Sequence, residues 1–147
     1  FMYHWLGSSP SSFSERAETQ DAVNKDHFIA VLPEGREIED GIIFEWPFSI
    51  LDIDLTILQE LQFFDDMLAC VAEQFTVDKN CVSSVGVSAG ALWTAQLAQR
   101  RGNRLASIVS ISGGTGGTVR PWEDSTHKMP AMVLWGGPYT CPRVPPQ

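Results

Sequence analysis

The chain has 147 residues, a length that fits one domain with a buried hydrophobic core. Its formal net charge is −8, with only ten lysines and arginines. A nucleic-acid-binding protein needs a basic face that replaces the counterions around phosphates, so this balance excludes nucleic acid as a partner. No apolar run reaches the ~20 residues that a membrane-spanning helix needs, so we expect no membrane segment.

The first half of the chain predicts a strand, a helix and a second strand. Residues 1–4 are apolar and β-prone and lead into a polar loop. Residues 12–25 carry apolar side chains at loose helical spacing. Residues 27–32 form an apolar run that predicts a buried strand ended by Pro33. Because core strands seldom start a native chain, we expect residues to be missing upstream.

A long helix is predicted to begin near Asp52 or Asp54 and to run to about Phe75. Either carboxylate can cap the free N–H groups of the first turn. Apolar residues recur every third or fourth position and predict one core-facing stripe: Leu58, Leu61, Phe64, Leu68, Val71 and Phe75.

The second half of the chain alternates strands and helices. We predict strands at 82–87, 105–111 and 132–135, and a helix at 89–101. Alternation of this kind is typical of a parallel sheet with helices on both sides. Four prolines mark 138–147 as an irregular tail outside the domain.

The cysteines leave the redox compartment open. Cys70, Cys81 and Cys141 form no C-x-x-C pair, so no metal site is predicted. A disulfide between Cys70 and Cys81 and two free buried thiols are both compatible with the predicted elements.

A G-x-S-x-G motif, Gly86 to Gly90, joins a predicted strand directly to a predicted helix. That context is the one required by a nucleophile elbow, in which Ser88 projects from a strained turn. Gly86 and Gly90 lack side chains where strand and helix approach closely. The N–H of Ala89, at the helix start, faces developing negative charge. The alternative is a turn that merely joins two elements.

Acyl transfer needs a second N–H donor for the oxyanion, from the loop after a neighbouring strand. The loop "HWLG" follows the first strand, and Leu6 is our candidate donor. We expect the side chain of His4 to hydrogen-bond locally and to shape this loop, without acting as the base.

Several segments together resemble the polyhydroxybutyrate depolymerase and feruloyl esterase branch of the α/β-hydrolases: "HWLGSS", "DHFIAVLPEG", "LASIVSISGG", "MPAMVLWGG" and the run from Phe63 to Ala98. The resemblance covers residues 1–137 and implies a three-layer, doubly wound parallel sheet of about five strands in the order 4-3-5-6-7. This core is incomplete at both ends. Leu6 and Ser88 would meet at its topological switch point.

The chain departs from this family where the catalytic acid and histidine are expected. No acidic residue follows Asp124, and no histidine follows His127. Asp124 and His127 are interpreted as a solvated loop pair, and His27 as structural. We therefore expect an incomplete hydrolase: a fragment, a truncation, or a product whose reading frame departs near Tyr139.

Trp5 and Trp135 both follow strands and are candidates to wall an acyl or aryl pocket, although plain packing is the alternative. The run Gly113 to Gly117 lacks the lysine and spacing of a phosphate-binding loop, and no cofactor is predicted.

These observations predict a serine carboxylesterase that hydrolyses aryl or hydroxyacyl esters through an acyl-enzyme on Ser88. The main alternative is a non-catalytic domain of the same fold, and a peptidase is a third reading. Exposed sheet edges predict self-association. The localisation stays unknown, and only the family resemblance suggests a secreted or periplasmic protein.

Overall fold

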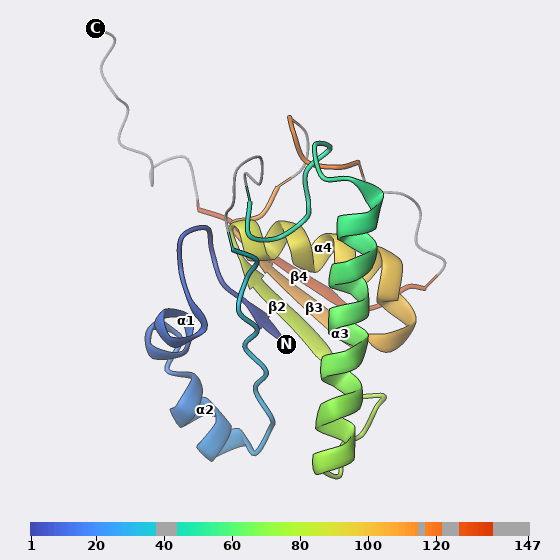
Figure 1. Cartoon of the computed structure of the whole chain (residues 1–147). Coiled ribbons are helices and arrows are strands. Elements are labelled where there is room, and N and C mark those ends of the chain that lie inside the picture. Colours follow the sequence, from blue (N-terminus) through green and yellow to red (C-terminus); the bar gives the residue numbers. More distant parts are fainter. Residues whose placement is uncertain (38–43, 115–116, 122–126, 137–147) are drawn as a thin grey trace, which may run out of the picture.

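A four-stranded parallel sheet lies at the centre of the computed structural model, which describes residues 1–37, 44–114, 117–121 and 127–136 (Figure 1). The strands lie in the order β1-β2-β3-β4. They are β1 Met2–Tyr3, β2 Ser83–Val87, β3 Ser107–Ile111 and β4 Ala131–Leu134. The predicted α/β architecture is confirmed, and parallel pairing brings all the carboxyl ends to one edge.

The register of the sheet places the ends of its two central strands side by side. Val87, the last residue of β2, pairs with Ile111, the last residue of β3. Tyr3, the last residue of β1, pairs with Gly86. The residues that follow these strands therefore emerge next to one another.

Among the residues that the structure describes, four α-helices lie around the sheet, and all four are labelled in Figure 1. They are α1 Pro10–Arg16, α2 Thr19–Asp26, α3 Asp54–Gln74 and α4 Ala89–Arg101. A short 3-10 helix, Gly102–Arg104, follows α4. Within the described ranges, no helix has both the length and the apolar character that a bilayer crossing requires.

The segment predicted as one helix at 12–25 is two helices. The chain turns between them at Glu18, whose φ of 47° is left-handed and cannot continue a right-handed helix. Helix α1 begins at a capped end, because the Ser9 hydroxyl accepts the N–H of Ser12 at 3.2 Å.

One hydrophobic core joins α3, α4 and the sheet. Its fully buried members include Tyr3, Trp46, Ile57, Leu61, Phe64, Trp93 and Leu97. Helix α4 is rich in alanine and lies close against the strands. The buried hydroxyls of Ser84 on β2 and Thr94 on α4 satisfy each other across that contact at 3.1 Å.

The strand predicted at 27–32 is wrong. His27 ends α2 in a left-handed conformation, with φ of 54°, and the segment that follows is irregular. The segment makes one backbone bond to the sheet, from Met2 N–H to the Val31 carbonyl at 2.9 Å. Because β1 has only two residues, it cannot support a longer ladder. The described sheet therefore has four strands rather than five, and Phe28 and Ile29 are exposed.

The predicted cap and stripe of the long helix are also wrong in detail. The N-cap residue of α3 is Ile53, and the Asp52 carboxylate accepts the N–H of Ser49 at 2.8 Å instead. Leu58 and Phe75 are 56% and 54% exposed. The buried residues of α3 lie on a stripe rotated from the predicted one: Ile57, Glu60, Leu61 and Phe64.

Cys70 and Cys81 are free thiols, and both are exposed rather than buried. Cys141 and the rest of the predicted tail lie outside the described residues.

Candidate active site

Ser88 occupies the junction between β2 and α4 in a conformation that is rare for a residue with a side chain. Its φ is 53° and its ψ is −115°. Strain of this kind costs about 1–3 kcal/mol and persists only where the surroundings fix it. Here the Ser88 N–H donates to the Ile111 carbonyl at 2.9 Å, and its own carbonyl accepts the N–H groups of Ala91 and Leu92. The residue is exposed at the carboxyl end of the sheet.

Gly86 and Gly90 lie where backbone approaches backbone without room for a side chain. A Cβ atom on Gly86 would overlap the carbonyl oxygen of Gly90. A Cβ atom on Gly90 would overlap the carbonyl oxygen of Tyr3 and come within 2.6 Å of that of His4. The first turn of α4 is therefore pressed against both β2 and the chain that leaves β1.

The loop after β1 is a tight turn held from inside the protein. The ring Nδ1 of buried His4 donates to the Trp5 carbonyl at 3.0 Å, and the Ser8 N–H donates to the same oxygen at 3.1 Å. Gly7 has φ of 69°, as required at the third position of a type II turn. The local hydrogen bond predicted for His4 is present.

The two candidate oxyanion donors both lie at the carboxyl end of the sheet. Leu6 is in the turn that follows β1, and Ala89 opens α4 directly after Ser88. Neither N–H has an acceptor within the part of the chain that the structure describes. Close contact between Gly90 and the end of β1 brings these two backbone segments together. Their convergence on a single oxyanion stays a prediction.

A general base for Ser88 is not identified. His4 is buried beneath its own loop, and His27 lies at the opposite end of the sheet, beside the start of β2. His127 is exposed. Within the described ranges, no hydrogen bond links the Ser88 hydroxyl to a histidine, and Asp124 lies outside them.

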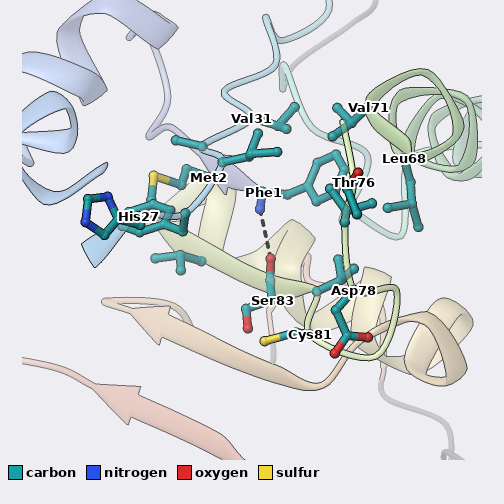
Figure 2. Close-up of a pocket in the computed structure, with 16 residues that line it drawn as sticks. Phe1, Met2, His27, Val31, Leu68, Val71, Thr76, Asp78, Cys81 and Ser83 are labelled. Carbon is teal, nitrogen blue, oxygen red and sulfur yellow. Dashed lines mark hydrogen bonds between the residues drawn. The ribbon is translucent and has the colours of Figure 1, made fainter. Parts of the chain in front are cut away.

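A cavity lies at the amino end of the sheet, at the other end from Ser88. It has a volume of about 570 Å³ and is lined by the start of β2, the segment 27–31 and the last turns of α3 (Figure 2). It includes Ser83, five residues before Ser88, on the amino side of the strand. This cavity is therefore not the candidate ester site.

Neither candidate pocket tryptophan lines that cavity. Trp5 stacks on Phe13, with ring centroids 6.1 Å apart, and the Arg16 guanidinium lies 5.5 Å from its ring. Trp135 is 74% exposed just past β4. A role for either in holding an acyl or aryl group stays a prediction.

Two residues next to the candidate site were not predicted to lie there. The Glu45 carboxylate accepts the Gly7 N–H at 3.1 Å, and the Trp46 indole donates to the His4 carbonyl at 2.9 Å. Both come from a segment that shows no periodicity, so no sequence signal placed them beside the loop.

Two buried side chains, Glu60 and Tyr3, have a raised pKa. Burial raises the pKa of Glu60 to about 7, although the charge of Arg36 opposes this shift. Burial also raises the pKa of Tyr3 far above its usual range. Both side chains belong to the packed interior and lie outside the turn that carries Ser88.

Comparison with known proteins gives fold-level likeness. No family model and no curated protein matches the chain. Among solved structures, native pOPH is similar with a TM-score of 0.63 and 17% identity, over 93% of this chain and 57% of that one. A variant of pOPH in complex with pNPB has a TM-score of 0.57 and 18% identity, over 76% and 40%.

A ferulic acid esterase is similar with a TM-score of 0.55 and 16% identity, over 76% of this chain and 45% of that one. The chain thus spans between 40% and 57% of the length of these structures. The likeness shows the fold alone, which is α/β-hydrolase-like.

Proposed function

We propose that this chain carries the nucleophile of a serine carboxylesterase in the polyhydroxybutyrate depolymerase and feruloyl esterase branch of the α/β-hydrolases. The observation that carries the proposal is the strained backbone of Ser88, with φ of 53° and ψ of −115°, at a strand–helix junction. That conformation exposes the residue at the carboxyl end of the sheet, beside the free N–H groups at the start of α4.

The proposed reaction is acyl transfer. The Ser88 Oγ attacks the ester carbonyl carbon as its proton passes to a base, and the carbonyl oxygen becomes an oxyanion. The N–H groups of Leu6 and Ala89 hold this oxyanion. Collapse of the tetrahedral intermediate breaks the bond to the leaving alcohol, which takes up a proton. Water then hydrolyses the acyl-enzyme.

Aryl and hydroxyacyl esters are the proposed substrates. The sequence resemblance supports this class, and one similar solved structure is a ferulic acid esterase. Trp5 and Trp135 are the proposed apolar walls for the acyl or aryl group.

Steady-state hydrolysis of a p-nitrophenyl ester tests the activity. We expect turnover by the wild type and a fall to the uncatalysed rate in Ser88→Ala. Ser112→Ala is a matched control, because Ser112 is also exposed, has φ of 53° and follows the neighbouring strand β3. Equal activity in wild type and Ser88→Ala would refute Ser88 as nucleophile.

The second candidate is a non-catalytic domain of the same fold. It is favoured by one observation: no histidine is bonded to the Ser88 hydroxyl in the described ranges. A folded wild-type chain without ester turnover would support this candidate.

A further inference from the structure

We propose that Glu45 is a positioning residue for the oxyanion loop, the turn formed by Trp5, Leu6 and Gly7. This inference rests on the proposed function. It assigns a role to a carboxylate that lies 38 residues along the chain from the N–H it accepts.

The oxyanion loop has several polar backbone groups, and the protein fixes those that flank Leu6. The Trp5 carbonyl accepts both the His4 ring and the Ser8 N–H. The Gly7 N–H donates to Glu45 Oε2 at 3.1 Å. Because the Trp5 carbonyl and the Gly7 N–H are occupied, the turn is held on both sides of Leu6, and the N–H groups of Trp5 and Leu6 have no acceptor within the described residues. Of these two, Leu6 is the proposed oxyanion donor.

Glu45 is itself held firmly, so it can act as a rigid support. Its backbone carbonyl accepts the N–H of Arg36 at 3.1 Å and the Arg36 side-chain Nε at 3.2 Å. Arg36 is anchored in turn by Asp52 at 3.1 Å. Gly35 allows this approach, because a Cβ atom there would lie 2.9 Å from that of Glu45.

The carboxylate lies close to the buried His4 ring, and its bond to the Gly7 N–H lies on the solvent-exposed side of the loop. The Glu45 side chain is only 12% exposed, and its Oε2 lies 3.9 Å from Nδ1 of buried His4. A hydrogen bond to an ionised acceptor is about twice as strong as a neutral one. Loss of the carboxylate leaves the left-handed Gly7 free to turn, and the Leu6 N–H moves with it.

The rate of covalent labelling by a fluorophosphonate probe tests this role, because phosphonylation of a serine also develops negative charge on oxygen. We expect Glu45→Ala to lower the maximal labelling rate by about 10- to 100-fold, with unchanged probe affinity. Glu45→Gln keeps an oxygen acceptor of the same reach, and we expect it to remain within about threefold of wild type. Glu34→Ala is an exposed control with no expected effect.

Thermal unfolding of each variant separates positioning from general damage, since Glu45→Ala and Glu45→Gln are compared at matched folded fractions. If wild type is labelled at Ser88 and Glu45→Ala is labelled as fast or faster, the inference alone is overturned. Faster labelling would mean that the carboxylate blocks a donor. If folded wild type is not labelled at all, the proposed function fails, and the inference with it.

Discussion

Gly90 shows at the scale of one residue how tightly the candidate site is built. Its Cα faces the carbonyl oxygens at the end of β1, with no space for a methyl group. We predict that Gly90→Ala lowers the free energy of unfolding by at least about 2 kcal/mol, because β1 and α4 must separate. Urea denaturation measures this loss. Gly114→Ala, where the added Cβ meets open space, is expected to stay within about 0.5 kcal/mol of wild type. Similar stabilities for both variants would contradict the close contact.

Glu60 predicts a pH dependence of stability. Its pKa is about 7 in the folded chain, against 4.5 when exposed. Below pH 4.5 both states are protonated, and as the pH rises from 4.5 to 7 the unfolded chain ionises first. The free energy of unfolding therefore falls by roughly 3 kcal/mol across this window.

Glu60→Gln removes that titration. Urea unfolding at each pH gives the difference in unfolding free energy between the variant and the wild type. We expect this difference to favour the variant more strongly at pH 8 than at pH 5. Glu73→Gln, at an exposed position of the same helix, serves as control. If the unfolding free energies of wild type and Glu60→Gln changed with pH in the same way, burial would not raise the pKa of the Glu60 carboxyl.

Single residues also show what could and could not be predicted at the candidate site. The motif around Ser88 is local in sequence, so its place between a strand and a helix followed from the pattern. Glu45 reaches Gly7 across 38 positions through an irregular segment, and no periodicity reports such a contact. Roles for Ser88, Leu6 and Ala89 remain predictions.

At the scale of elements, long periodic segments were predictable and their partners were not. The stretch 27–32 has the composition of a strand, but a strand needs a neighbour, and β1 offers only two residues. In α3 the spacing correctly predicted one buried face, which includes Leu61 and Phe64. It did not show that buried Glu60 shares that face while Leu58 is exposed.

The rotated face of α3 gives a prediction of its own. Leu61 is 1% exposed and Leu58 is 56% exposed. We expect Leu61→Ala to cost about 2–5 kcal/mol of unfolding free energy and Leu58→Ala less than about 0.5. Chemical denaturation of the two variants compares them directly. If Leu58→Ala lowered the free energy of unfolding more than Leu61→Ala, Leu58 would belong to the buried face of α3, as the sequence spacing predicted.

At the scale of the whole molecule, strand β4 has no strand on its outer side within the described residues. Its side chains are all exposed, with Met132 and Val133 at 56% and 50%. Unpaired backbone on such an edge can pair with another copy. We predict concentration-dependent association of the chain by sedimentation velocity, weakened in Val133→Lys. Leu58→Lys, equally exposed on α3, should not change it. A monomer at every soluble concentration would refute the prediction.

The α/β-hydrolase-like fold leaves many chemistries open, so the central claim concerns Ser88 alone. Peptide mapping by tandem mass spectrometry after fluorophosphonate treatment locates the modified residue. We predict one adduct, on the peptide that contains Ser88, which persists in Ser112→Ala and disappears in Ser88→Ala. An adduct on any other serine, or a folded chain that stays unmodified, would contradict the account.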